Sequence, residues 1–218
     1  MKFQLQKIKL NLTDHQGFTL IELLVATVIM SLVVTLAGSA FVTLLEKNRE
    51  EEYEVQRRTN LNRALDYIAN EVRRSSQIQA GDPAAGEVLQ LTIQEQNPAF
   101  TAFASPPNPP YTTVTRIYSV ANGTGVWQDN SSGSQTIIRG NDVLVDAIKA
   151  PTTPPTCPTG STMSPSSGGN GFYACIYAGG KKADLYLYGK LTDDQNDPNY
   201  NNPLEVKKTV FTRNTAVN

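Results

Sequence analysis

The feature that most constrains this chain is an apolar run from Phe18 to Leu45. The run has 28 residues, contains no proline and carries one formal charge, on Glu22. As an α-helix it would extend for roughly 42 Å, which exceeds the hydrocarbon core of a bilayer at about 30 Å. The apolar core of a cleaved secretory signal is only about 7 to 15 residues long. The sequence therefore predicts a membrane-spanning helix.

The charges on either side of the run predict its orientation. Lysines precede it at Lys2, Lys7 and Lys9, and five glutamates lie within residues 46–54 after it. Because positively charged flanks stay in the cytoplasm, residues 1–17 are expected there, and the rest of the chain is expected to be exported.

Glu22 is the residue that a simple membrane helix does not explain. A carboxylate inside a bilayer is costly without a partner, so we expect a positively charged group to meet it. The alternative is a glutamate that lies near the headgroups and faces water.

The residues around Glu22 resemble a known processing site. The stretch Gly17-Phe18-Thr19-Leu20-Ile21-Glu22 is similar to the cleavage site of type IV prepilins and the related pseudopilins. The resemblance implies that a prepilin peptidase cuts between Gly17 and Phe18 and methylates the new amino terminus. It also implies that Glu22, then the fifth residue, pairs with the Phe18 amine of a neighbouring subunit.

The same resemblance implies partners and a location. The partners are the prepilin peptidase and methylase, other pilins or pseudopilins, an inner-membrane assembly platform and the lipid bilayer. The chain is expected first as a single-pass inner-membrane protein and later in a periplasmic or cell-surface filament.

The apolar run also carries a hydroxyl stripe, with one residue every four positions. Such stripes allow close helix packing and hydrogen bonds between helices. Alternatively, each hydroxyl bonds a carbonyl of its own helix and faces lipid. The stripe consists of Thr27, Ser31, Thr35, Ser39 and Thr43.

The helix is expected to continue beyond the membrane as an amphipathic segment, residues 46–78. Up to Asn60 its substantial apolar residues are Tyr53 and Val55, and Glu54 can pair with Arg58. Further along, an apolar stripe recurs at helical spacing and must dock on another element. It comprises Leu61, Leu65, Ile68 and Val72, with Ala64 and Ala69 alongside.

Residues 79–218 are expected to form a β-rich extracytoplasmic head. Short segments with strand patterns are separated by turn signals, and no further amphipathic helix follows, so we expect an antiparallel sheet covered by the 61–72 stripe. The expected strands are 89–93, 112–120, 125–128, 135–140, 141–148, 183–191 and 207–214, and residues 105–110 and 150–171 are expected loops. The expected fold class is α+β and pilin-like.

Parts of the chain resemble one subgroup. The stretches LNRALDYIANEVRRSSQI, YSVANGTGVWQDN and VFTRN are similar to the minor pilins called PilW or PulJ. The resemblance implies a minor pilin or a minor pseudopilin.

Composition and motifs argue against catalysis. The formal net charge is −1, and the single histidine, His15, lies in the expected leader. The mature chain therefore has no histidine for a triad, and no phosphate-binding loop or hydrolase motif is found. Nucleic-acid binding is not predicted, because the lysine doublets 181–182 and 207–208 are too few to form a basic stripe.

Three smaller features have competing explanations. Cys157 and Cys175 are expected to pair in an exported head, although two separate thiols are the alternative, and zinc has weak support. Asp193, Asp194 and Asp197 could bind calcium, but a solvated turn before Pro198 is favoured, and no cofactor is predicted. The tyrosines of the head could form a binding face or pack between strands: Tyr173, Tyr177, Tyr186 and Tyr188.

Two functions remain open at this point. The leading hypothesis is a structural subunit, a minor pilin or pseudopilin of a type IV pilus or a type II secretion-like filament. The alternative is an adhesin or DNA-capture module that uses the helix only as an anchor. An anchor does not need Gly17 and Glu22 together.

Overall fold

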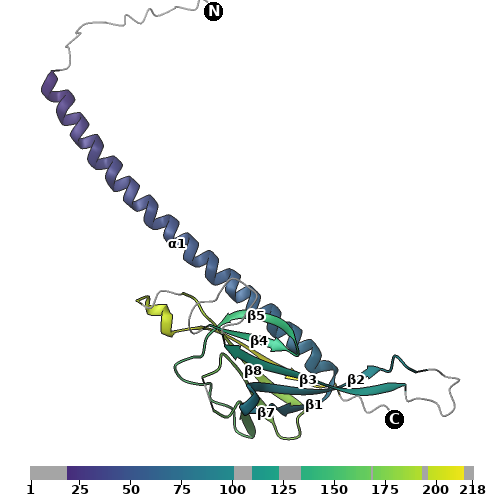
Figure 1. Cartoon of the computed structure of the whole chain (residues 1–218). Helices are drawn as coiled ribbons and strands as arrows, with labels where there is room; N and C mark the ends of the chain where they lie inside the picture. The colour runs from purple at the N-terminus through teal and green to yellow at the C-terminus, as the bar shows by residue number, and fades with distance from the viewer. Residues whose placement is uncertain (1–18, 101–109, 123–133, 168, 193–195, 214–218) are drawn as a thin grey trace, which may run out of the picture. The chain divides into compact units, whose positions relative to one another are not determined.

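The computed structural model describes residues 19–100, 110–122, 134–167, 169–192 and 196–213. One long helix, α1 (Leu20–Arg74), is followed by antiparallel strands (Figure 1), which confirms the expected α+β architecture. Contacts divide the chain into two compact units, residues 1–50 and residues 51–218.

The described part of the second unit contains nine strands in one sheet, and every pairing is antiparallel. The 3-10 helices are η1 (Pro83–Ala85) and η2 (Pro198–Asn201). In chain order the strands are β1 (Ser75–Ala80), β2 (Glu87–Gln96), β3 (Tyr111–Asn122), β4 (Gln135–Arg139), β5 (Asp142–Ile148), β6 (Ser161–Ser164), β7 (Phe172–Tyr177), β8 (Lys182–Gly189) and β9 (Leu204–Phe211).

The sheet has two groups of strands. Strands β1 to β5 form a meander in chain order, and in the second group β8 lies between β7 and β9, with β6 beside β7. The groups meet where Ile148 of β5 pairs with Gly189 of β8. Strands remote in sequence are thereby joined into one surface for the helix to cover.

The last turns of α1 pack on this sheet through the predicted stripe. A Cβ at Gly189 would come within 2.5 Å of Leu61 Cδ1, so a larger residue there would displace this leucine side chain from its packed position. Full burial of one such leucine contributes about 1.5–3 kcal/mol. The buried residues on this face are Leu61, Ala64, Leu65, Ile68, Ala69 and Val72, which confirms the stripe and the docking partner.

The segment before this stripe is exposed, as its composition indicates. Tyr53 is 68% exposed and Val55 is 66% exposed. Arg58 Nη2 lies 3.3 Å from Glu54 Oε1, so the predicted pair is present.

The structure corrects three sequence expectations. The helix predicted to residue 78 ends at Arg74, because Ile78 pairs with Leu91 of β2 and is buried as part of β1. Strand β6 lies inside the expected loop 150–171, and β7 was not predicted at all. The other predicted strands fall within β2, β3, β4, β5, β8 and β9 or overlap them, while the 125–128 segment is outside the described residues.

A buried charged network also fastens α1 to the sheet. Glu71 accepts hydrogen bonds from Arg139 Nη2 at 2.6 Å and from the Tyr118 hydroxyl at 2.5 Å. Burial and the hydrogen bond to Glu71 raise the pKa of the Tyr118 phenol. Burial by itself would lower the pKa of Arg139, but the hydrogen bond and charge of Glu71 raise it overall. Both groups therefore keep their protons and remain hydrogen-bond donors to Glu71.

Removing Glu71 should destabilise the head strongly. Glu71→Ala leaves the Arg139 guanidinium, 18% exposed, without its main partner, so we expect a loss of about 3–5 kcal/mol in the free energy of unfolding. Glu54→Ala is the matched control, because it breaks an exposed helical pair worth about 0.3–0.5 kcal/mol. Denaturant unfolding of the detergent-solubilised chain measures both. Equal losses in the two variants would contradict this expectation.

Candidate functional site

The first turn of α1 is closed by a reciprocal cap between Thr19 and Glu22. The Thr19 hydroxyl and the Thr19 N–H donate to Glu22 Oε2 at 3.0 and 3.2 Å, and the Glu22 N–H lies 3.3 Å from Thr19 Oγ1. This arrangement is a capping box. The two side chains accept hydrogen bonds from two backbone amides that have no carbonyl partner within the helix. The cap was not among the sequence predictions, although threonine followed three residues later by glutamate is its sequence signature.

The cap fixes where the Glu22 carboxylate lies and leaves part of it available. The carboxylate sits at the amino end of the helix, where the helix dipole favours negative charge. Both donated hydrogen bonds reach Oε2, and Oε1 accepts none from the residues that the structure describes. A carboxylate has about four acceptor positions, so a further donor can still bind.

The helix that carries this carboxylate presents an apolar surface on all sides. Every residue from Leu20 to Glu50 is exposed, and the segment is long and apolar enough to cross a membrane. Exposed apolar area of this extent marks a surface that lipid or other protein covers. The candidate site is therefore a whole helix surface with one acidic group near its start.

The hydroxyls of the stripe form their hydrogen bonds within the helix. Each hydroxyl donates to a carbonyl three or four residues earlier, at 2.8 to 3.1 Å, in the manner of a lipid-facing position. A packing role does not need these donors, since small side chains alone permit close approach. Gly38 beside the stripe has open space around its Cα, with no atom within 4 Å of a Cβ built there.

Several predicted site residues lie outside the described part. Gly17 and Phe18, the processing pair, are among them, as are Asp193 and Asp194. Asp197 accepts a hydrogen bond from the Asn199 N–H at 2.7 Å and caps η2. Within the described ranges no three histidine, cysteine, aspartate or glutamate side chains form a group that could hold a metal ion, and the calcium hypothesis stays a prediction.

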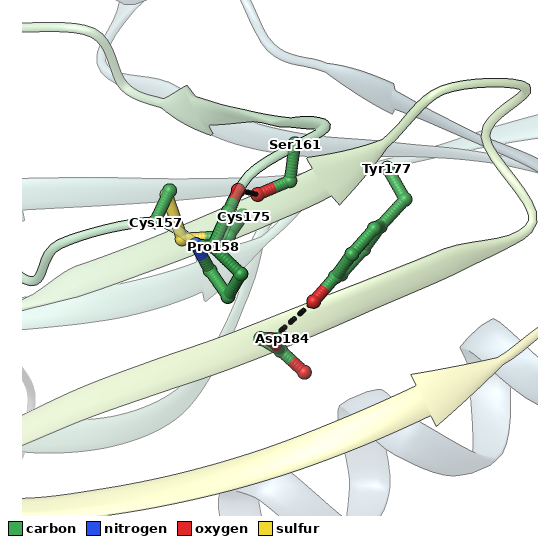
Figure 2. The surroundings of a disulfide bond; sticks show 6 residues. All are labelled: Cys157, Pro158, Ser161, Cys175, Tyr177 and Asp184. Atoms are coloured by element: carbon green, nitrogen blue, oxygen red, sulfur yellow. Dashed lines mark hydrogen bonds between the residues drawn. A yellow bond between two sulfur atoms is a disulfide. The ribbon is translucent and has the colours of Figure 1, made fainter.

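The predicted disulfide is present. Cys157 and Cys175 are bonded with their Cα atoms 5.5 Å apart, and the bond ties the segment before β6 to the middle of β7 (Figure 2). Nearby, the Ser161 hydroxyl donates to the Pro158 carbonyl at 2.7 Å. This arrangement holds a long irregular segment against the sheet.

The tyrosines mostly pack beneath this segment. Tyr173, Tyr186 and Tyr188 are at most 5% exposed and form a second apolar cluster with Cys175. Burial raises the pKa of Tyr188, as does its hydrogen bond to Glu205. The packing explanation therefore holds for these three, while Tyr177 is half-buried and donates to Asp184 (Figure 2).

Removing the disulfide should loosen the head. In the chain-entropy treatment a loop of this length contributes about 3 kcal/mol, so Cys157→Ser with Cys175→Ser should lower the free energy of unfolding by that order. Ser161→Ala is the control in the same segment and should cost about 1 kcal/mol or less. Denaturant unfolding gives both values. Non-reducing peptide mapping that recovered two free thiols from the mature protein would contradict the bond itself.

Comparison with known proteins adds one match. A comparison with curated proteins and another with solved structures gave no match. Residues 12–38 match the family described as the prokaryotic N-terminal methylation motif, a range that contains Gly17, Phe18, Glu22 and most of the apolar run. The match supports the resemblance to type IV pilins at the end of the chain where the capped carboxylate lies. This chain therefore carries an amino-terminal methylation motif of the prepilin type, and the part of the motif from Leu20 onward lies on an exposed apolar helix.

Proposed function

We propose that this protein is a structural subunit of a type IV pilus or a type II secretion-like filament. One observation carries the proposal. From Leu20 onward the methylation motif, residues 12–38, lies on an exposed apolar helical segment, and the one carboxylate of that segment is held at the first turn with an acceptor atom still available. Membrane anchoring needs the apolar surface, but it does not need the carboxylate.

The proposed sequence of events follows from the chemistry of these residues. A prepilin peptidase cleaves after Gly17 and methylates the Phe18 amine. The processed helix remains in the inner membrane, with its amino end on the cytoplasmic side, and leaves the bilayer when the subunit enters the filament. On leaving, it exchanges lipid for the helices of neighbouring subunits, so the apolar surface stays covered.

Within the filament the Glu22 carboxylate meets the Phe18 ammonium of a neighbour. The capping box positions Oε2, and Oε1 is the acceptor for the incoming amine. In a low-dielectric core, an ion pair with good geometry compensates for the desolvation of both charges, whereas a single charge remains costly. A subunit whose Glu22 does not meet a neighbour's Phe18 ammonium keeps an unpaired charge in the core, so misplaced subunits are disfavoured.

The head fits an exported subunit. It contains a disulfide, which persists in oxidising compartments, and a sheet tied to α1 by the apolar stripe and Glu71. A filament subunit needs no catalysis of its own. The minor-pilin role and the PilW or PulJ subgroup rest on the resemblance of three short stretches.

Deletion of the gene, with complementation, tests the proposal. We expect the wild-type chain in the sheared filament fraction with a mature mass that begins at N-methylated Phe18. Pili, secretion and DNA uptake should be scored together, since loss of one identifies the filament type. A chain that stays entirely in the membrane fraction while filaments form normally would favour the anchored adhesin or DNA-capture alternative.

A further inference from the structure

Strand β3 is much longer than β4, the strand that follows it in the sheet. It has 12 residues, whereas β4 has 5 and pairs only with residues 118–122 of β3. Residues 111–117, here called the open edge, pair with β2 on one side and have no strand on the other side within the described residues. An unfilled strand position therefore lies beside β3, in line with β4, where β2 and β3 extend beyond the other strands (Figure 1).

Two backbone hydrogen bonds show which groups of β3 point into this position. The Asn97 N–H donates to the Pro110 carbonyl at 2.9 Å, so these two residues bond each other across the β2–β3 hairpin. In an antiparallel pair, successive residues direct their N–H and C=O groups alternately toward the partner strand and away from it. Ile117 follows the same alternation, because its carbonyl accepts from the Gly140 N–H, on the side away from β2, at 3.3 Å.

The unpaired backbone groups of the open edge therefore belong to Tyr111, Thr113 and Thr115. The register between β2 and β3 is unbroken along this stretch, so their N–H and C=O groups recur at roughly 6.8 Å intervals. All three residues are exposed, and none forms a backbone hydrogen bond on this side with any described residue. The ligand that offers acceptors and donors at the same spacing is another extended polypeptide backbone.

The open edge lacks the protection that the other edges of the sheet have. Strand β9 pairs only with β8 among the described strands, and it carries Lys207 and Lys208, charges that discourage further pairing. Strand β6, at the end of the sheet, has only 4 residues. The open edge has a single charge, Arg116, which is paired with Glu95 at 2.6 Å, and most of its residues are β-branched.

The projecting end of the β2–β3 hairpin also lacks a third strand. Strand β1 pairs with β2 only as far as Ile93, so residues 94–96 and 111–113 pair only with each other among the described residues. A ribbon of two strands is marginally stable in water, and a third strand stabilises it. An added strand therefore gains most at this end of the sheet.

We propose that the open edge binds an extended, uncharged segment of another protein, which adds as a strand beside β3 and in line with β4. Backbone hydrogen bonds to Tyr111, Thr113 and Thr115 supply the affinity, and alternate side chains of the segment supply the specificity. The segment is uncharged because the one charge of the open edge already has its partner.

A second copy of this chain is the competing occupant. Two identical edges pair antiparallel about a two-fold axis perpendicular to the sheet. This axis reverses the direction of residues 61–72 of α1, which lie along the sheet. Subunits inserted from one membrane have their helices in the same direction, so a different protein is favoured. This one step rests on the proposed function.

The test titrates a synthetic peptide against the full-length chain in detergent. The probe is Val-Thr-Val-Thr-Val-Thr with blocked ends and a dye on a flexible tail, and fluorescence anisotropy reports its binding. Methylation of every amide nitrogen of the probe should weaken binding at least about tenfold, since it removes all donors of the added strand.

Amide hydrogen exchange, measured by NMR, locates the bound peptide. At saturation, exchange should slow at least about tenfold at Tyr111, Thr113 and Thr115, whose N–H groups point away from β2. The amides of Thr112 and Val114 already bond to β2 and should change less than about twofold. Only a strand added at the open edge predicts this alternation.

Thr113→Pro supplies the matched change in the protein. Proline removes one outward N–H and is tolerated on an edge strand, because that N–H is not part of the β2–β3 ladder. We expect binding of the probe to weaken at least about tenfold, whereas Thr113→Ala keeps the N–H and should bind within about twofold of wild type. Denaturant unfolding of both variants checks the fold, and the exchange pattern of the wild-type chain decides the matter if the proline variant does not fold.

Three results would overturn the inference. They are no saturable binding of the probe, equal affinity of the folded proline and alanine variants, and protection at amides that face both sides of β3. Dimerisation of the purified chain that Thr113→Pro abolishes would assign the open edge to a second copy. Wild-type chain that enters sheared filaments but does not bind the probe leaves the proposed function standing, and chain that binds the probe but stays out of filaments removes only the proposed function.

Discussion

Gly17→Leu is expected to leave residues 1–17 on the chain and the protein in the membrane. The peptidase must bring its reacting groups against the backbone at this bond, and glycine is the residue that permits the closest approach. A leucine side chain displaces the bond, and a misplacement of about 1 Å costs roughly a hundredfold in rate. Intact-mass analysis of membrane and sheared fractions measures the cleaved share.

Gln16→Leu is the matched control for this change. It places the same side chain one position earlier and should leave cleavage at Gly17 almost complete, with Phe18 methylated. Efficient cleavage of the Gly17→Leu chain would remove the support that the motif gives to the proposed function. Retention of residues 1–17 in wild-type cells would do the same.

Glu22→Ala is expected to spare membrane insertion and cleavage but to prevent efficient entry into filaments. Removing a carboxylate eases the isolated helix in the bilayer, where an acidic residue costs roughly 2.5 to 3.5 kcal/mol on insertion scales. Cleaved monomer should therefore accumulate rather than disappear. We expect the ratio of sheared to membrane-bound protein to fall at least about tenfold, which corresponds to about 1.4 kcal/mol.

Two further variants separate the ion pair from the cap. Glu22→Gln keeps an acceptor for Thr19 but removes the charge, so its ratio should lie between those of wild type and Glu22→Ala. Thr19→Val keeps the charge and removes the hydroxyl of the cap, a loss of about 1 kcal/mol in helix stability, and should reduce incorporation less than Glu22→Ala does. Equal incorporation of wild type, Glu22→Gln and Glu22→Ala would mean that this carboxylate is not the assembly contact.

The features that the sequence predicted correctly depend on neighbours along the chain. Helical geometry alone predicts three of them: the length of the run from Phe18 to Leu45, the Glu54–Arg58 pair, and the stripe from Leu61 to Val72. Alternating patterns likewise predicted most strands of the head, and two cysteines in an expected exported segment predicted the disulfide.

The errors occurred where pairing outweighs local preference. Residues 75–78 continue a helix-compatible pattern, yet pairing with β2 and burial of Ile78 make them a strand. The serine- and glycine-rich stretch before β7 obscured β6 and β7, because strand propensity depends on the neighbouring strand as much as on composition.

What the sequence by itself determined is the amino-terminal part of this protein: a membrane-length helix and its methylation motif, because these depend only on consecutive residues. What only the tertiary structure decided are the contacts between distant segments. Glu71 meets Arg139 and Tyr118 because α1 lies across β3 and β4, a long-range arrangement that no local spacing encodes. The Arg213 N–H donates to the Arg73 carbonyl for the same reason, because pairing of β9 with β8 brings the residues after β9 to the end of the helix.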